Sequence, residues 1–226
     1  MKTPQIAKER DYWWTVLAVD PLAIPLTRFL ARTRWLSPDQ VSAGCLVLGL
    51  LVGPVYLIDG RWGLVAGAIL FYLAFLLDCV DGKLARARGT GSARGEILDE
   101  LADNSRKASV SMGLAVRLWS ADPAGGGFWW AVGYGVVGLL FAMVSGGTRG
   151  EPGTSLGGGW SRALARRRLL PTPGTPDVGA IVSIFGPLTG AVVPALVVGD
   201  ALLVLATALV LSRRLRRSEG SARRPK

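Results

Sequence analysis

The chain has no histidine and only two cysteines among its 226 residues. The lack of histidine excludes imidazole bases and most zinc sites, and it leaves carboxylates as the proton acceptors that an enzyme would use. Cys45 and Cys79 lie in or at the end of apolar segments, and their spacing fits no metal motif. We interpret both as small hydrophobic residues near a reducing compartment.

A cleavable signal peptide is also not visible. The first eleven residues are polar, and the apolar stretch that follows contains Asp20, Pro21 and Pro25. Apolar residues are abundant instead: half of the chain is hydrophobic, and the mean hydropathy is +0.37. This length and composition predict one compact membrane domain that inserts through its own spans.

The hydropathy pattern predicts an all-α membrane protein with six transmembrane helices. Several of the apolar runs approach the roughly 20 residues that a bilayer-spanning helix needs. The expected spans are residues 41–58, 62–77, 97–119, 128–146, 178–198 and 201–211. We expect residues 1–212 to form a single domain, and residues 213–226 to be a basic, disordered tail.

The segment before the first span, residues 11–33, is too polar to cross a membrane comfortably. We expect it to lie along the headgroups, with Trp13 and Trp14 at the aromatic belt. Ser37 followed by Pro38 then predicts the start of the first spanning helix, because serine is a favourable N-cap and proline is favourable at the first helical position.

The positive charge is distributed unevenly between the two expected sides of the membrane. Of the 26 Lys and Arg residues, 22 lie in the N-terminal segment, the 83–94 and 147–177 connectors and the C-terminal tail. The other four are Arg61, Arg106, Lys107 and Arg117. By the positive-inside rule, both termini and these connectors face the cytoplasm. The net charge of +10 therefore indicates topology and attraction to anionic lipid rather than nucleic-acid binding. The abundance of Arg, Ala and Gly is typical of GC-rich bacteria, which suggests a bacterial inner membrane.

Four aspartates stand where the second and third spans meet the connector 83–94. Asp78 and Asp81 share a helix face by i,i+3 spacing, and Asp99 and Asp103 are related by i,i+4. A short hairpin brings the two pairs together, so the four carboxylates repel one another unless a cation neutralises them. Ligand sets made only of oxygen favour Mg²⁺ or Mn²⁺.

The run that contains these aspartates is Asp78-x-x-Asp81-Gly82-x-x-Ala85-Arg86, eight residues, then Gly95-x-x-x-Asp99-x-x-x-Asp103. It resembles the signature of class I CDP-alcohol phosphotransferases, also called CDP-alcohol phosphatidyltransferases, at every fixed position. The resemblance implies a homodimeric membrane enzyme that moves a phosphatidyl or related group from a CDP-linked donor to a small polar alcohol and releases CMP. The donor is most often CDP-diacylglycerol in this family.

The resemblance also assigns roles to the motif residues. It implies that two Mg²⁺ or Mn²⁺ ions are held by Asp78, Asp81, Asp99 and Asp103, and that Asp103 is also the general base. It implies that the CDP moiety is bound by Asp78, Asp81, Gly82, Ala85, Arg86 and Gly95. Gly82 and Ala85 are small enough for the nucleotide to approach the backbone, and Arg86 offers a forked donor for phosphate.

The acceptor is less constrained by the sequence. A phosphorylated polyol, such as glycerol phosphate or inositol phosphate, is one hypothesis, because arginine binds phosphate in bidentate fashion. Its binding residues would be Arg106, Lys107, Arg166, Arg167 and Arg168, with Arg162 nearby. The connector arginines are equally explained as topology anchors. Arg106 and Lys107 need a partner within their span, and they could pair with the acids, reach the interface or bind the acceptor.

Two alternative functions use the same acids. A non-catalytic homologue or an ion- or proton-coupled transporter would also place carboxylates in a membrane. Asp99 alone is explained by helix capping, but Asp78 and Asp81 are expected at the C-terminal end of a helix, where the dipole disfavours them. A transporter does not account for Gly82, Ala85, Arg86 and Gly95, so the sequence favours the enzyme.

Overall fold

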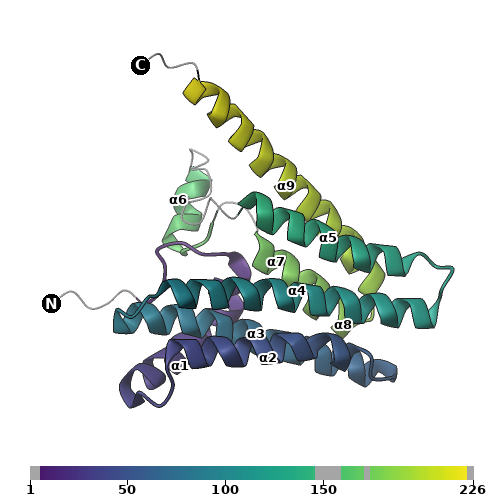
Figure 1. Ribbon diagram of the computed structural model, residues 1–226, viewed down its shortest axis with the longest axis horizontal. Coiled ribbons are helices and arrows are strands. Elements are labelled where there is room, and N and C mark those ends of the chain that lie inside the picture. The colour runs from purple at the N-terminus through teal and green to yellow at the C-terminus, as the bar shows by residue number, and fades with distance from the viewer. Residues whose placement is uncertain (1–5, 146–158, 171–173, 223–226) are drawn as a thin grey trace.

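The computed structural model describes residues 6–145, 159–170 and 174–222, and these residues are almost entirely helical (Figure 1). The only strand-like feature within them is an isolated bridge between Asp11 and Leu169. The elements in chain order are η1 (Thr15–Val19), α1 (Asp20–Thr33), α2 (Pro38–Tyr56), α3 (Gly60–Arg88), α4 (Ala93–Ala121), α5 (Gly127–Ser145), α6 (Gly159–Arg166), α7 (Thr175–Ala180), η2 (Ile181–Phe185), α8 (Gly186–Thr189) and α9 (Val192–Ala222).

Four of the described helices are long and apolar enough to cross a membrane: α2, α3, α5 and the Val192–Arg216 part of α9. The all-α membrane class is therefore confirmed, but six spans are not. Helix α4 has 29 residues, yet its charged N-terminal half keeps it out of this group. The expected fifth span, 178–198, is wrong in its boundary, because the chain turns at Gly190, whose φ is +79°.

This turn corrects the C-terminal part of the prediction. Glycine adopts the left-handed conformation without steric cost, so α7, η2 and α8 end at Thr189 and α9 begins at Val192. The expected connector at 199–200 lies inside α9. The helix also continues past Leu211 to Ala222, through the first part of the segment for which a disordered tail was expected.

The helical hairpin that carries the four aspartates also differs from the prediction. Helix α3 does not end at Leu77 but continues to Arg88, and Gly89 closes it with a φ of +65°. Asp78 and Asp81 therefore lie within the helix and not at its C-terminal end. Ser92 begins α4, since its hydroxyl accepts a hydrogen bond from the Gly95 N–H at 3.0 Å.

The N-terminal helix α1 packs along α3. Val19, Ala23 and Leu30 form a buried cluster with residues of α3 that include Val80 and Leu84. The start of α2 is as predicted: Ser37 caps the helix in a reciprocal pair with Gln40, and Pro38 occupies the first helical position. The headgroup location of residues 11–33 stays a prediction.

Helices α2 and α4 approach each other at glycine. A Cβ placed on Gly53 would lie 2.3 Å from the Ser109 carbonyl oxygen, and one on Gly113 would lie 2.4 Å from the Gly53 carbonyl oxygen. Gly49 and Gly53, which have GxxxG spacing, thus both serve close helix packing inside the bundle. This close contact fixes α4, and with it Asp99 and Asp103, against the α2–α3 pair.

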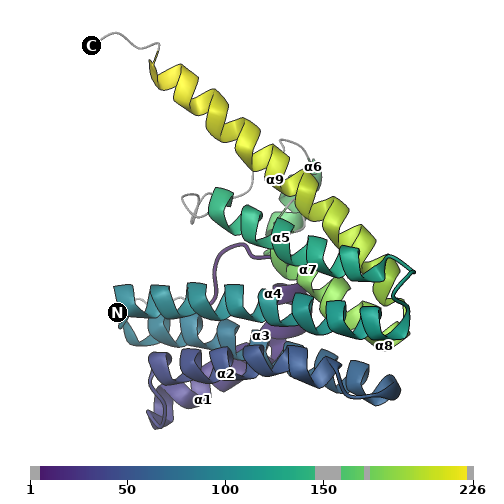
Figure 2. The same ribbon diagram turned by 45° about the vertical axis from the view of Figure 1, so that its right-hand side comes forward.

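The long helices run back and forth between two ends of the bundle (Figures 1 and 2). The turns at 57–59, 122–126 and 190–191 lie at one end. The 89–92 turn and the C-terminal end of α9 lie at the other. The basic 83–94 connector and the basic end of α9 therefore lie at the same end of the bundle.

Candidate active site

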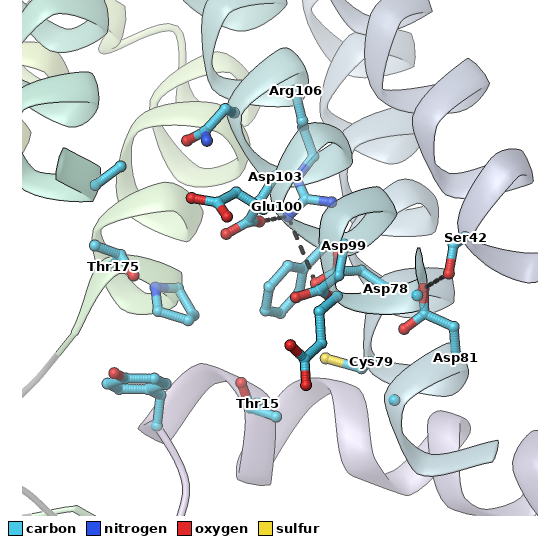
Figure 3. A pocket seen from close by; sticks show the side chains of 18 of the residues that line it. Thr15, Ser42, Asp78, Cys79, Asp81, Asp99, Glu100, Asp103, Arg106 and Thr175 are labelled. Atoms are coloured by element: carbon cyan, nitrogen blue, oxygen red, sulfur yellow. Dashed lines mark hydrogen bonds and ion pairs between the residues drawn. The ribbon is translucent and has the colours of Figure 1, made fainter. Parts of the chain in front are cut away.

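A cavity of about 1090 Å³ opens at the end of the bundle that holds the 89–92 turn, and all four aspartates line it (Figure 3). Asp78 and Asp81 come from α3, and Asp99 and Asp103 come from α4. Gly82, Ala85, Arg86 and Gly95 line the same cavity. Every fixed residue of the sequence motif thus reaches one space, because the tight α3–α4 hairpin folds the two halves of the motif together.

Arg106 lies beside two of the four carboxylates (Figure 3). Its Nη2 forms an ion pair with Asp103 Oδ1 and lies 3.7 Å from Asp78 Oδ2. Lys107 adds a second positive charge, with Nζ 3.3 Å from Asp103 Oδ2. Of the three explanations that the sequence left open for Arg106, the structure selects pairing with the acids.

The surroundings of Arg106 explain how its charge is tolerated. The side chain is only 3% exposed, and its guanidinium lies over the rings of Phe71 and Phe75 at 5.8 and 5.3 Å from their centroids. Aromatic faces attract a desolvated cation. Gly49 of α2 makes room for the side chain, because a Cβ there would lie 3.1 Å from Arg106 Cβ.

Asp81 is held apart from this cluster by Ser42 of α2. The Ser42 hydroxyl lies 2.5 Å from Asp81 Oδ2 and donates to it, and both side chains are buried. Sequence reasoning did not identify Ser42 as a site residue. Its only signal was its position one turn after the Ser37 cap, on a helix that had to pack against α3.

Three further motif residues, Gly82, Arg86 and Gly95, have neighbours at hydrogen-bond or ordinary van der Waals distance. A Cβ on Gly82 would meet only the Arg86 guanidinium, at an ordinary 3.5 Å. Arg86 is exposed, and its Nε donates to the Ile6 carbonyl at 3.3 Å. The backbone N–H of Gly95 donates to Ser92. These positions leave space at the cavity wall, and their contacts with a nucleotide stay a prediction.

Lys83, the first residue of the expected 83–94 connector, is a buried residue of helix α3. It is 3% exposed within α3, and its Nζ lies 2.9 Å from Asp20 Oδ1. The other oxygen of Asp20 pairs with Arg168 at 3.0 Å. Lys83 therefore ties α1 to α3 at the cavity wall. Arg88 has a comparable role, since it donates to the carbonyls of Leu30 and Leu36 and holds the α1–α2 connection.

The N-terminal segment forms one wall of the cavity together with residues of α7, which include Thr175, Pro176 and Gly179. Asp11 bridges Leu169, Trp13 Nε1 donates to the Leu170 carbonyl at 2.7 Å, and the Trp14 N–H donates to Asp177 at 2.6 Å. Burial raises the pKa of the Asp177 carboxyl, although its hydrogen bonds with the backbone oppose this effect. These contacts hold Tyr12 and Thr15 at the cavity surface.

The expected acceptor residues are only partly brought together. Arg106 and Lys107 line the cavity, whereas the described lining does not include Arg166, Arg167 or Arg168. Arg166 and Arg167 are exposed, and Arg168 is occupied by Asp20 and the Lys8 carbonyl. The side chain of Arg162 lies outside the described residues. Two arginines that the sequence did not single out, Arg213 and Arg214, reach the cavity because α9 extends beyond Leu211.

The donor chemistry of the site fits a hard divalent ion, because the four motif carboxylates and further Asp and Glu side chains line one partly buried cavity. In the part of the chain that the structure describes, however, no three His, Cys, Asp or Glu side chains are gathered closely enough to hold one ion. Arg106 supplies the positive charge at Asp78 and Asp103. Metal binding at this cluster would therefore need small side-chain movements within the cavity.

Comparison with known proteins gives a consistent result. The sequence model of the CDP-alcohol phosphatidyltransferase family matches residues 35–212. A bifunctional IPC transferase and DIPP synthase of Rubrobacter xylanophilus is 36% identical over 169 residues, which are 74% of this chain and 34% of that protein. A cardiolipin synthase (CMP-forming)/mitochondrial hydrolase fusion protein of Schizosaccharomyces pombe is 32% identical over 93 residues, 41% of this chain and 15% of that protein. The chain thus spans about a third of the first relative and less of the second.

Solved structures of Mycobacterium tuberculosis phosphatidylinositol phosphate synthase share the fold. The structure with CDP-DAG bound has a TM-score of 0.60 at 24% identity, and the match covers 87% of this chain and 92% of that one. The complex with manganese and citrate has a TM-score of 0.58 at 25% identity, with 86% and 88% covered.

Proposed function

Since the chain belongs to the CDP-alcohol phosphatidyltransferase family, we propose that it transfers a phosphatidyl or other phosphoalcohol group from a CDP-alcohol to a hydroxyl acceptor and releases CMP. The observation that carries this proposal is that all eight fixed motif residues line one cavity. A transporter needs the acids but gives no reason for Gly82, Ala85, Arg86 and Gly95 to line the same space.

Asp103 is the general base of the proposed reaction. Its carboxylate takes the proton of the acceptor hydroxyl as the oxygen attacks the β-phosphorus of the donor, and CMP leaves with the electron pair of the broken P–O bond. Its side chain is 42% exposed, so an acceptor that enters the cavity can reach it. Lys107 holds the carboxylate in place from the following turn of α4.

Two divalent ions, Mg²⁺ or Mn²⁺, belong to the proposed function. Asp78, Asp81, Asp99 and Asp103 would hold them, and the ions would neutralise charge on the diphosphate of the donor. Support comes from the four motif carboxylates that line the cavity and from the manganese complex of the Mycobacterium tuberculosis synthase, which is 25% identical. Ser42 then has the role of orienting Asp81.

We propose CDP-diacylglycerol as the donor and a phosphorylated polyol as the acceptor. The cavity places the apolar side chains Phe71, Phe75 and Phe141 beside the acids, as a lipid donor requires. Arg213 and Arg214 with Lys107 give it positive charge for an acceptor phosphate. CMP release from CDP-diacylglycerol, measured with glycerol phosphate, inositol phosphate, free inositol and serine in turn, tests the acceptor. Turnover with serine or free inositol alone would overturn this assignment.

Two variants test catalysis itself. Asp103→Asn should lower CMP release at least a thousandfold, about 4 kcal/mol in barrier, while binding of the CDP donor with Mg²⁺ largely survives. Asp78→Asn should weaken metal and nucleotide binding together. Full CMP release by both variants would remove the catalytic assignment and favour transport.

We further propose that the protein is a homodimer in a bacterial inner membrane, with both termini and the active site in the cytoplasm. The charge distribution supports this orientation. Single cysteines at Ser92 and Gly126, in a variant without Cys45 and Cys79, should be labelled from opposite faces of sealed vesicles. Labelling of both positions from one face would contradict the proposed topology.

A further inference from the structure

Arg106 has no counterpart among the fixed residues of the motif, yet it contacts two of the motif carboxylates. We propose that Arg106 is a built-in counter-ion that neutralises Asp78 and Asp103, and that a divalent metal ion must compete with it for these carboxylates. The proposal rests on the metal role given to the four aspartates above, and it adds a residue that limits metal affinity.

The contacts of Arg106 identify the oxygens for which the two cations compete. Its Nη2 approaches Asp78 Oδ2 and Asp103 Oδ1 at once, so a single group joins α3 to α4 across the acids. Asp103 Oδ2 is already shared with Lys107. Among the described residues, Asp78 Oδ1 accepts only a long contact from Cys45 Sγ at 3.8 Å, so an ion that binds both Asp78 and Asp103 has to take an oxygen of Asp103 that is in use.

Because Asp78 and Arg106 are largely buried, the Asp78 carboxylate needs a cation partner at all times, and Arg106 also needs a partner for its own charge. Asp78 and Arg106 are 15% and 3% exposed, and a buried charge without a partner is strongly destabilising. The guanidinium thus protects the fold while the acids hold no metal. When metal occupies the acids, the guanidinium and the metal repel each other at short range, which weakens metal binding.

The aromatic rings give the displaced guanidinium an alternative partner. Phe71 and Phe75 both face it, and Nη1 also donates to Cys45 Sγ at 3.4 Å. A small shift toward these groups keeps the cation in favourable contacts while it releases the carboxylates. Arg106 can therefore exchange its partners without leaving the interior.

Arg106→Met tests the proposal because methionine keeps an unbranched apolar chain in contact with the rings but removes the guanidinium and its charge. Mn²⁺ binding to the purified protein is measured by the electron paramagnetic resonance signal of the free ion, and thermal unfolding is measured with EDTA and with saturating Mn²⁺. We expect at least tenfold tighter Mn²⁺ binding. We also expect that Arg106→Met unfolds at a lower temperature than the original protein when both are in EDTA. Saturating Mn²⁺ should remove most of this difference in unfolding temperature.

Arg117→Met is the matched control, because Arg117 lies on the same helix and contacts backbone carbonyls near the opposite end. It should lower the unfolding temperature equally with and without Mn²⁺ and leave Mn²⁺ affinity unchanged. A purely structural role for Arg106 predicts this same pattern for Arg106→Met. Unchanged or weaker Mn²⁺ binding by Arg106→Met overturns the proposal.

Two further measurements separate this proposal from the proposed function. If Arg106→Met cannot be purified, Arg106→Lys keeps the charge but shortens its reach, and Mn²⁺ affinity should still rise about threefold; no rise overturns the counter-ion role. If Asp78→Asn and the original protein bind Mn²⁺ equally, the metal site itself is wrong, and both proposals fall. Normal Asp78-dependent binding with no effect of Arg106 overturns only the counter-ion role.

Discussion

Arg106 and Arg117 lie on the same helix, three turns and roughly 16 Å apart along its axis, and they have opposite kinds of partner. Arg117 donates to the carbonyls of Tyr56, Ile58 and Gly60 at 2.7–2.8 Å and closes the α2–α3 turn. Arg106 contacts carboxylates. The carbonyls of a turn have no other cation to bind, whereas the carboxylates of the cavity can bind a metal ion. Only Arg106 can therefore be exchanged for another cation.

The same contrast separates the two ends of the bundle. At the end with the 57–59 turn, polar side chains close turns and helix contacts through backbone groups. At the end with the cavity, Lys83, Arg106 and Lys107 are paired with carboxylates. Charge pairs concentrate where a charged substrate and metal are proposed to bind, and hydrogen bonds to backbone carbonyls serve where only packing is needed.

Lys83→Met should give the largest loss of stability among the variants that leave the motif intact. Removing one partner of a buried ion pair typically costs about 3–5 kcal/mol, and Arg168 remains on the other oxygen of Asp20, so we expect about 3 kcal/mol or less. Thermal unfolding in detergent measures the loss. CMP release per folded molecule should change little, because Lys83 pairs with Asp20 and not with a motif carboxylate.

The matched variant for Lys83 is Arg168→Met. Arg168 contacts the same Asp20 carboxylate but is 34% exposed, so its loss should destabilise the protein by at most about 1 kcal/mol, as for exposed pairs. Equal losses for Lys83→Met and Arg168→Met would show that burial does not set the strength of this three-residue cluster.

The sequence predicted that the eight motif residues meet, because the motif combines fixed spacing with a hairpin. Two i,i+3 or i,i+4 pairs on consecutive antiparallel helices meet in almost any tight connection, and all of these residues line one cavity. The start of α2 at Ser37 was also predictable, since a capping residue acts through local backbone hydrogen bonds.

The partners of the site residues were not predictable, because they depend on long-range packing. Nothing near Ser42 in the sequence indicates Asp81, which is 39 positions away. Arg213 and Arg214 were assigned to a tail because hydropathy falls after Leu211, but helical structure continues through charged residues. The turn at Gly190 was missed because a single glycine inside an apolar run does not by itself indicate a break.

Arg117→Met should have a smaller effect than Lys83→Met. The carbonyls that it leaves lie at a turn where two of the three bonds are exposed, so water can replace part of the interaction. We expect a loss of about 1–2 kcal/mol, at the lower end of the range for hydrogen bonds to charged groups. Thermal unfolding measures it, and a loss larger than that of Lys83→Met would reverse the proposed contrast between the two ends.

Ser42→Ala should have the smallest effect on stability and a selective effect on activity. Losing the hydrogen bond to Asp81 costs about 1 kcal/mol, and the freed carboxylate should lower CMP release several-fold. Ser109→Ala is the control, because its hydroxyl links α2 and α4 through Leu50 and Gly53 and touches no acid. Both variants should unfold at similar temperatures, while only Ser42→Ala loses activity per folded molecule. Equal activity in the two would mean that Asp81 does not need Ser42 to orient it.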